Sequence, residues 1–575
     1  MRVLFQATGN LSGYTGNLLV RIRIARRPRS RLRPALAQRS FDPAATRIRH
    51  TPERLRAGGS SRVALGILVS RLTGLIRERF IGHYFGIETV VADAFRSAIR
   101  IPNMLNTLFG EGVLSASFVT VYSKLRALQQ EEEAEHLAAA IFGILTLVCS
   151  LLVFTGITCS PLLIDIIAPG FEGARRALTI HLVRILFPGT GLLVLSAWCL
   201  GVLNSHRRFL LSYLAPVALN VAIIIVLLAF GRRDDVNRLV LDAAWGYVLG
   251  SALQFLVQLP RVLQLLPGFR PVFDVQSPHV RSVMRSFGPI FLSRGVVQIS
   301  ALVDQMIASW LPQGAVAALS AGQVISNLPI SLFSMSVSAA ELPALSSAVG
   351  TPDQIAEVLR TRLRSGLRRI AFFVIPSATA FLLLGDVLAA GLYQTGRFHY
   401  SDSVYLWAVL TGSGVGLLAT ALGRLYSSAF YALFDTRTPL RFAVIRVTFT
   451  IVLGYLCALH GPGLLGIDPK WGVAGLTSSA GVAGWIEFVL LRRALKNRIG
   501  PTPLSVRLTV QLWSIAAAAG AIGFGMKHLV GVQHPILLAA SVIPVYGAIY
   551  IFGARLLGIS EAEEVTRSVA RLLSR

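Results

Sequence analysis

Apolar runs of about 20 residues recur along the chain from Ser70 to Ala554. A helix needs about 20 mostly apolar residues to cross a bilayer, so this recurrence is typical of a polytopic helical membrane protein. Hydrophobic residues make up 54% of the 575 residues and charged residues only 14%, whereas a soluble protein carries about 25% charged residues. A transmembrane β-barrel would show short alternating segments instead. We therefore expect an all-α polytopic membrane protein with about 14 transmembrane helices.

The basic residues set the expected orientation. The formal net charge is +27, but outside the first 62 residues Lys and Arg gather in the connectors between apolar runs, as the positive-inside rule predicts. Connectors after even-numbered spans hold most of them, which places those connectors and both termini in the cytoplasm. This distribution argues against a nucleic-acid partner and favours a multi-pass membrane protein.

The chain divides into five predicted parts. Residues 1–60 contain no acidic residue before Asp42 and many arginines, so we expect a basic, disordered extension or a start codon assigned too far upstream. Span one and span seven resemble each other weakly, and each is followed by a long helix with an internal proline, Pro102 or Pro329. Two six-helix lobes plus an extra helix pair would suit a transporter built from repeats. The remaining predicted parts are an N-terminal lobe (61–275), a C-terminal lobe (276–500), a C-terminal helix pair (501–557) and an amphipathic tail (558–575).

The most unusual stretch is Ser70–Gly112, where many charges lie in two predicted helices. Each arginine at a bilayer centre costs about 2.5–3.5 kcal/mol on insertion scales, so these helices need partners, a watery cavity or a charged ligand. At 100° per residue, one arc of about 80° on the second helix holds the polar side chains: Asp93, Arg96, Arg100, Asn103 and Glu111. This face predicts a hydrophilic cavity, and two arginines one turn apart suit phosphate oxygens. The alternative is a structural pairing of these arginines with Asp93. In a cavity, Asp93 and Glu111 would orient the arginines or release them as the conformation changes.

Other charges inside predicted spans add candidates. Arg71 and Arg77 are expected to line the same cavity, while Arg79 is expected to pair locally with Glu78. Asp304 in the seventh span is a candidate site for a coupling ion, or else it neutralises a nearby arginine.

Soluble catalytic motifs are absent from the sequence. It contains no Walker A loop, no HExxH and no GxSxG, and its four cysteines show no metal-binding spacing. We expect a transporter rather than an enzyme, with no cofactor and no metal. Its energy would come from the membrane potential, a monovalent cation or the substrate's own gradient.

The opening stretch closely resembles the first two helices of the MurJ/MviN family, which are lipid II flippases of the multidrug/oligosaccharidyl-lipid/polysaccharide exporter superfamily. The residues that carry the resemblance are SRLTGLIRERFIGHYFG and ADAFRSAIRIPNMLNTLFGEG. Further blocks follow in the family order: IIAPGF (166–171), RILFPG (184–189), LAPVALN (214–220), VDQMIASWLPQGAVAALSAGQ (303–323), LYQTGRF (392–398) and ALFDTRTPLR (432–441).

The resemblance implies alternating access that moves a polyprenyl-pyrophosphate-linked peptidoglycan precursor, lipid II, to the outer leaflet for cell-wall synthesis. It implies membrane lipids as partners, with cell-wall synthesis enzymes as further candidates. Two departures stand out, because Asn106 and Gln323 occupy positions where the family has arginine; Arg96 and Arg100 are expected to supply replacement charge. Asp304 fits a family ion site, but residues 438–460 contain no second carboxylate. The predicted substrate-binding set is Arg71, Arg77, Arg96, Arg100, Asp93, Glu111 and Gln323.

Two alternatives stay open. The departures favour a flippase for another undecaprenyl-linked oligosaccharide, and a non-transporting membrane scaffold for cell-wall enzymes belongs to a different class. A drug exporter would need an acidic cavity for cationic drugs, whereas this cavity is predicted to be basic.

Overall fold

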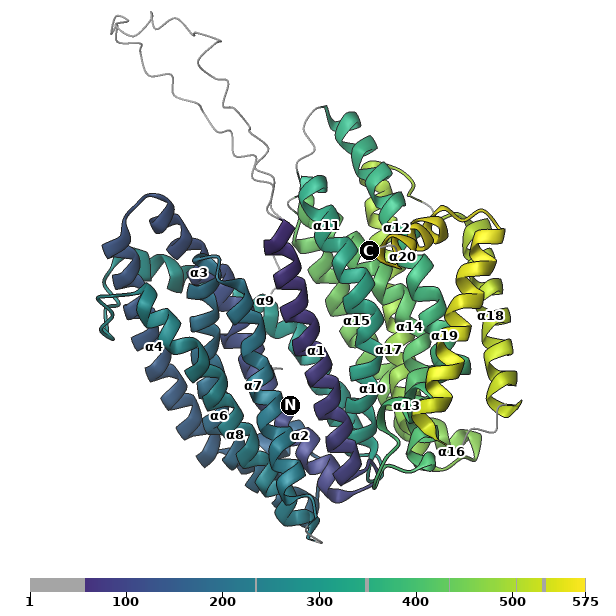
Figure 1. Ribbon diagram of the computed structural model, residues 1–575, viewed down its shortest axis with the longest axis horizontal. Coiled ribbons are helices and arrows are strands. Elements are labelled where there is room, and N and C mark those ends of the chain that lie inside the picture. Colours follow the sequence, from purple (N-terminus) through teal and green to yellow (C-terminus); the bar gives the residue numbers. More distant parts are fainter. Residues whose placement is uncertain are drawn as a thin grey trace, which may run out of the picture. The chain divides into compact units, whose positions relative to one another are not determined.

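The computed structural model describes residues 57–232, 235–346, 351–433, 435–502, 504–529 and 534–573. The predicted N-terminal extension therefore lies outside the described residues, apart from its last few positions. Within the described part, residues from Gly58 onward form one compact unit, and it is built of helices (Figure 1). The all-α fold class is confirmed.

The first half contains eight helices in its described residues. They are α1 (Ala57–Phe85), α2 (Val90–Phe109), α3 (Glu111–Ala127), α4 (Glu131–Thr158), α5 (Ser160–Ile167), α6 (Gly173–Ser205), α7 (Phe209–Phe230) and α8 (Val236–Leu265). Helix α6 is at the centre of this group, since it contacts α2, α3, α4, α5, α7 and α8.

The second half begins with a long helix and continues through shorter ones. Its first members are α9 (Pro278–Ser309), α10 (Ala315–Pro329), the π-helix η1 (Ile330–Ser334), α11 (Met335–Ser346), α12 (Pro352–Leu383), α13 (Gly385–Tyr393) and α14 (Tyr400–Ala432). Then follow α15 (Arg437–Tyr455), the π-helix η2 (Leu456–His460), α16 (Gly461–Leu465), the 3-10 helix η3 (Pro469–Trp471) and α17 (Gly472–Ile499). Helix α14 is central here and contacts α10, α11, α12, α13, α15 and α17.

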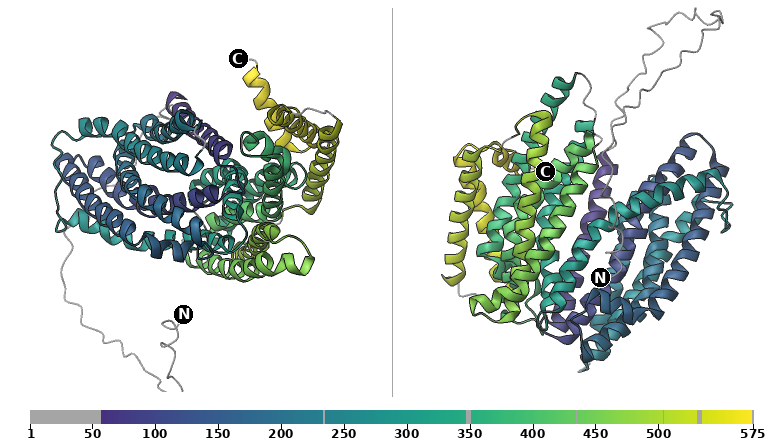
Figure 2. Two further views of the ribbon diagram at one scale, coloured as in Figure 1. Left: turned by 90° about the horizontal axis from the view of Figure 1, so that it is seen from below. Right: turned by 180° about the vertical axis from the view of Figure 1, so that it is seen from behind.

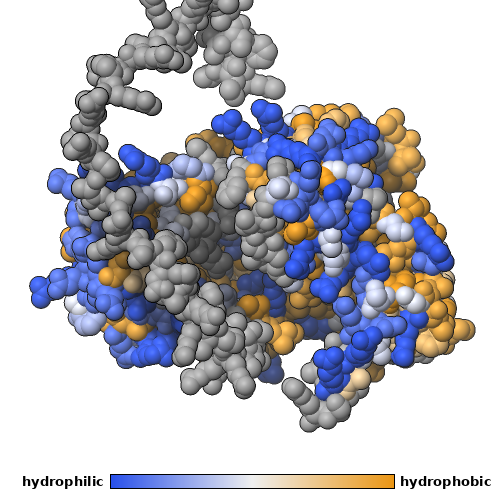
Figure 3. Space-filling model, turned by 90° about the horizontal axis from the view of Figure 1, so that it is seen from above, coloured by the Kyte–Doolittle hydropathy of each residue, from blue (hydrophilic) through white to orange (hydrophobic). Residues whose placement is uncertain are grey.

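Helices α18 (Val506–Leu529) and α19 (Pro535–Leu556) form the C-terminal pair and lean on α12 and α13. Figure 3 shows hydrophobic side chains along this flank and hydrophilic ones over the end that faces the viewer. Leu529, Leu556 and Phe552 are among the exposed apolar residues of the pair. A flank of this kind suits contact with lipid rather than water.

Eleven helical segments of the described residues are long and apolar enough to cross a membrane. The helices α1, α2 and α9, which coincide with predicted spans one, two and seven, are not among them. Arginines and carboxylates interrupt these three helices, which lowers their mean hydropathy. The count of fourteen spans and the predicted domain boundaries stay predictions.

The second predicted helix, which the wheel treats as continuous from Asp93 to Glu111, is instead broken at Gly110 between α2 and α3. A Cβ at Gly110 would meet the carbonyl oxygen of Asn106 and, at 3.1 Å, the Cβ of Ala197. Glycine is therefore required where α3 turns away against α6. The break also means that Glu111 begins a new helix, so a wheel drawn through one continuous helix does not apply to it.

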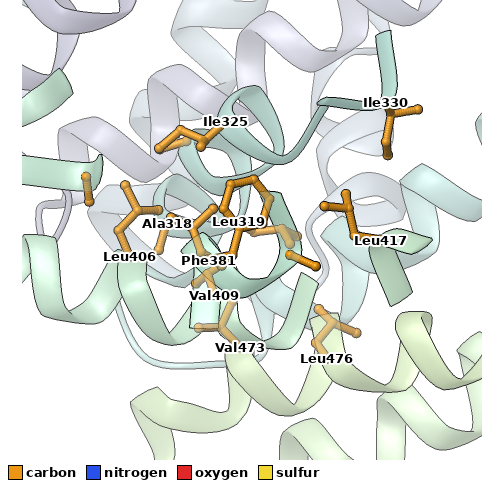
Figure 4. Close-up of a cluster of buried hydrophobic side chains, with 14 of the residues drawn as sticks. Ala318, Leu319, Ile325, Ile330, Phe381, Leu406, Val409, Leu417, Val473 and Leu476 are labelled. Carbon is orange, nitrogen blue, oxygen red and sulfur yellow. The ribbon is translucent and has the colours of Figure 1, made fainter. Parts of the chain in front are cut away.

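The buried core of the second half lies between α10, α12, α14 and α17 (Figure 4). Helices α14 and α17 approach each other so closely that a Cβ on Gly416 would overlap the Cα of Gly481. The indole nitrogen of Trp485 donates to the carbonyl oxygen of Val415 at 2.8 Å beside this crossing. These contacts make α14 and α17 one rigid wall.

Helix α1 lies between the two groups of helices (Figures 1 and 2), and its side chains contact both halves. Arg77 donates to Asn220 on α7, whereas Arg79 donates to the carbonyl oxygens of Gly391 and Leu392 on α13. Helix α9 likewise contacts α3, α4 and α5 as well as α15 and α17. Helices α1 and α9 therefore contact both halves of the chain.

The C-terminal helix α20 (Ser560–Leu573) is held to α12 by a bidentate ion pair, in which Arg368 donates to the two carboxylate oxygens of Glu561 at 2.8 and 3.0 Å. Burial raises the pKa of Glu561, but the hydrogen bonds from Arg368 outweigh it and leave the pKa below the ordinary 4.5. A lowered carboxyl pKa stabilises the folded state above the unfolded pKa, and this stabilisation is lost as the pH falls through the folded value.

We therefore expect Glu561→Gln to weaken docking of α20 by about 1 kcal/mol at neutral pH, since Arg368 is partly exposed. Hydrogen exchange over residues 560–573 measures this, and the difference from the wild type should shrink as the pH falls below 4.5. Glu563→Gln is the matched control, because the partner of Glu563 among the described residues is Arg567 of the same helix, at 2.7 Å. Equal exchange in both variants would contradict the docking role.

Candidate functional site

A polar cavity of about 500 Å³ lies between α2, α9, α10, α14, α15 and α17. The six helices come from both halves of the chain, so the cavity occupies the interface between them. Its charged and amide side chains are Arg100, Asn103, Gln298, Asp304, Gln323, Asn327, Arg424 and Arg446.

A second hollow of about 400 Å³ lies beside α1, where Arg71, Arg77 and Glu78 face α10, η1 and α11. Asn327, Ile330 and Arg424 border both hollows, so the two share a wall. The π-helix η1 starts at Ile330, at this junction. π-Turns of this kind occur often at functional sites because they locally loosen the helical hydrogen bonding.

The structure places Arg100 and Gln323 together on the cavity wall, as predicted. Arg100 donates to the side-chain oxygen of Gln323 at 3.0 Å and to the carbonyl oxygen of Ala301 at 3.3 Å. The amide at position 323 thus orients the guanidinium of Arg100. On the neighbouring hollow, Arg71 donates to Ser331 at 2.9 Å and its side chain is exposed.

Glu78, rather than Asp93, is the acidic partner of two predicted site arginines. Arg77 donates to one carboxylate oxygen of Glu78 at 2.6 Å, and Arg96 is hydrogen-bonded to the other. The predicted pairing of Glu78 with Arg79 is wrong, since Arg79 instead binds carbonyl oxygens of α13. Arg96 on α2 is therefore bound to Glu78 on α1 and is not among the residues that border the larger cavity.

Asp93 lies away from the arginines it was expected to orient. Its carboxylate is fully buried and accepts the backbone N–H groups of Gly314 at 2.8 Å and Ala317 at 2.9 Å. It also accepts a hydrogen bond from Arg175 at 3.2 Å. The expectation that Asp93 orients Arg96 or Arg100 is therefore wrong for this conformation, because Asp93 caps α10 and joins it to α6.

Glu111 and Asp304 are the remaining predicted positions. The side chain of Glu111 lies outside the described residues, so its substrate role stays a prediction. Asp304 borders the larger cavity, and its Oδ1 is buried with no hydrogen-bond partner among the described residues. An unpaired carboxylate oxygen at this place is compatible with a cation-binding site. The role of Asp304 in ion coupling stays a prediction. No group of His, Cys, Asp and Glu that could hold a metal ion occurs in the described part.

Two cavity arginines escaped the sequence-based prediction. Arg424 on α14 and Arg446 on α15 both border the larger cavity, and Arg446 pairs with Glu487 on α17 at 3.3 Å. Both lie inside apolar helices. The free-energy cost of placing an arginine in such a helix could have identified them as cavity residues from the sequence. Five arginines and two carboxylates now border the hollows: Arg71, Arg77, Arg100, Arg424, Arg446, Glu78 and Asp304. A cavity with this excess of guanidinium groups is suited to an anion with several oxygens.

Residues 81–540 match the family described as "Lipid II flippase MurJ". The chain belongs to this family. It is 31% identical over 469 residues to the "Lipid II flippase MurJ" of Burkholderia cenocepacia, which covers 80% of this chain and 87% of that protein. It is 29% identical over 522 residues to the "Probable lipid II flippase MurJ" of Rhizobium meliloti, covering 88% and 94% of the two chains. The resemblance drawn from the sequence motifs is confirmed.

Solved structures agree on the fold. The structure titled "Lipid II flippase MurJ, inward closed conformation" has a TM-score of 0.70 at 22% identity and covers 86% of this chain and 98% of its own. An inward-facing multidrug MATE transporter of the MOP superfamily has a TM-score of 0.61 at 18% identity, covering 76% and 98%. As a member of the MurJ family with eleven candidate spans, the chain is a multi-pass membrane protein and a transporter rather than an enzyme.

Proposed function

We propose that this chain is a flippase that moves lipid II from the inner to the outer leaflet of the cytoplasmic membrane. Family membership supports lipid II as the substrate. The arginine-rich cavity between the two halves is the observation that supports the mechanism, in which the cavity binds the anionic headgroup. Lipid II carries its pyrophosphate between an apolar polyprenyl chain and a polar sugar-peptide headgroup. The headgroup would enter the cavity while the polyprenyl chain stays among the lipids.

Arg71, Arg77 and Arg100 would attract the pyrophosphate and the polar headgroup electrostatically. Guanidinium groups bind phosphate oxygens through paired N–H donors, which gives the contact both strength and orientation. Transport also requires that affinity differ between the inward- and outward-open cavity, since only differential binding shifts the balance between conformations. Contacts such as that of Arg71 on α1 with Ser331 on η1 join different helices and would change with the conformation.

The energy source and the orientation belong to the same proposal. We expect coupling to the membrane potential or to a monovalent cation, with Asp304 as the candidate cation site. Both termini would lie in the cytoplasm, as the charge distribution predicts. Binding of cell-wall synthesis enzymes stays a prediction.

A flippase assay in a bacterium depleted of its own lipid II flippase tests the proposal. Expression of this chain should restore lipid II at the outer leaflet. Each of the variants Arg71→Ala, Arg77→Ala and Arg100→Ala should reduce this exposure by about tenfold, because each removes a charge-assisted contact of about 1.5–3 kcal/mol. Arg493→Ala is the matched control, since Arg493 is an exposed arginine of α17 that borders neither hollow.

The outcomes separate the remaining alternatives. Failure of the parent chain to restore lipid II would favour another undecaprenyl-linked oligosaccharide as the substrate, or the non-transporting scaffold. Restoration that survives all three arginine substitutions would contradict the cationic-cavity mechanism.

A further inference from the structure

Arg424 is a cavity arginine whose guanidinium has no ion-pair or hydrogen-bond partner among the described residues. Its side chain is exposed, and it borders both the larger cavity and the hollow beside α1. No described residue forms an ion pair or hydrogen bond with its guanidinium, whereas Arg77, Arg96 and Arg446 each have a carboxylate. The guanidinium of Arg424 is therefore available to a ligand in the cavity.

Arg446 lies at a similar depth on the neighbouring helix. Residues 433–436 join α14 to α15, and a connection this short makes consecutive helices antiparallel. Arg424 is eight residues before the end of α14 and Arg446 is nine residues after the start of α15, so they lie about 12 and 14 Å from the connection at 1.5 Å per residue. Both guanidinium groups therefore reach the cavity at one level.

A single carboxylate serves these two arginines. Glu487 pairs with Arg446 at 3.3 Å, and the two side chains keep 16% and 28% of their exposure. The other acid of the cavity, Asp304, comes from α9, the helix that also supplies the carbonyl oxygen held by Arg100. The wall of α14, α15 and α17 thus presents two arginines and one carboxylate, which leaves it with a net positive charge.

The wall that holds Arg424 is rigid, because α14 and α17 are in contact at Gly416 and Gly481. Arg100 belongs to α2, from the first half of the chain, and borders the same cavity. A ligand bound to Arg100 and to Arg424 at once would therefore bridge the two halves. Such a bridge forms only in conformations that bring the halves together, which gives binding a dependence on conformation.

We propose that Arg424 and Arg446 form a second anion-binding subsite, on the second-half wall of the cavity, that takes an oxyanion of the transported headgroup. This inference rests on the proposed flippase function and deepens it. The shared chemistry is a phosphate or carboxylate oxygen, from either the pyrophosphate or the peptide part of lipid II. Glu487 competes for Arg446 and releases it when the ligand anion arrives.

Binding measurements on the full chain in nanodiscs test this subsite. The probes are lipid II, polyprenyl pyrophosphate without sugar or peptide, and inorganic pyrophosphate. Arg424→Gln and Arg446→Gln should each weaken lipid II binding by about tenfold, whereas Glu487→Gln should strengthen it about threefold by freeing Arg446. Arg493→Gln on α17 is the matched control, and Arg424→Lys should keep part of the affinity because it keeps the charge.

The three probes identify the group that is bound. Equal weakening for lipid II and polyprenyl pyrophosphate assigns the subsite to the pyrophosphate, and weakening for lipid II alone assigns it to the peptide carboxylates. Unchanged binding of every probe in Arg424→Gln and Arg446→Gln, with melting temperatures equal to the control, overturns the subsite while the flippase proposal stands. If the wild type binds inorganic pyrophosphate through Arg424 but not lipid II, the subsite stands and the flippase proposal fails.

A structural role for the Arg446–Glu487 pair would give a different pattern. Removing either partner would then lower the melting temperature and weaken ligand binding alike. Tighter binding in Glu487→Gln, with weaker binding in Arg446→Gln, distinguishes competition for the arginine from simple support of the fold.

Discussion

Glu78→Gln should lower the free energy of unfolding by about 3 kcal/mol, the low end of the cost of breaking a buried ion pair, because Arg77 keeps 23% exposure. Glu78 is 4% exposed and holds both Arg77 and Arg96. A neutral amide at this position would leave two guanidinium groups with no carboxylate in a poorly solvated place. Thermal unfolding in detergent, followed by tryptophan fluorescence, measures the loss.

Two companion variants make the result specific. Glu88→Gln removes an acid that is 39% exposed and lies 3.5 Å from Lys470, so it should cost at most about 1 kcal/mol. Glu78→Gln combined with Arg96→Gln removes one of the stranded charges and should recover part of the stability. A melting temperature for Glu78→Gln equal to that of Glu88→Gln would show that the three-residue network does not stabilise the fold.

The same network explains what could be predicted from the sequence. Insertion costs identified Ser70–Gly112 as unusual, because hydropathy and charge depend only on the local sequence. They also placed Arg71, Arg77 and Arg100 at a cavity, where the structure has them. The fold class followed from the apolar runs, and the family from contiguous motifs.

The partner of each charge could not be predicted in this way. A helical wheel orders the side chains of one helix, but Arg96 and Glu78 meet across two helices and Asp93 meets α10 through residues more than 200 positions away. The wheel also assumed an unbroken helix, and Gly110 ends α2 where the close approach of Ala197 leaves no room for a side chain. Tertiary contacts therefore decided the roles of Asp93 and Arg96.

Asp93 and Glu78 have different structural tasks despite lying in the same motif. Glu78 neutralises arginines of α1 and α2 near the hollow beside α1, whereas Asp93 binds α2 to the start of α10 and to Arg175 of α6. The contact made by Asp93 joins the first half of the chain to the second. A transporter that alternates between two openings must break such contacts at one end and remake them, so Asp93 is well placed to control one of the two conformations.

Asp93→Ala should therefore loosen the first turn of α10 and slow transport. The carboxylate accepts the N–H groups of Gly314 and Ala317, and hydrogen bonds to a charged group contribute about 1.5–3 kcal/mol each. Their loss should speed amide hydrogen exchange over residues 311–318 by roughly ten- to a hundredfold, as read by mass spectrometry. Arg175 would keep its hydrogen bonds to the carbonyl oxygens of Gly170 and Ser309, so the faster exchange should stay confined to the start of α10.

Asp235→Ala is the control for an ordinary helix cap. Asp235 accepts the N–H groups of Asn237 and Arg238 at the exposed start of α8, so its hydrogen-bond partners in the described part lie within the same helix. Its loss should cost about 1 kcal/mol, confined to α8, and leave lipid II exposure at the outer leaflet unchanged. If Asp93→Ala affected exchange only in α10 and transport remained at the wild-type rate, the contact would be a cap alone. Faster exchange together with a transport rate reduced by about tenfold or more would identify it as part of the gate between the two halves.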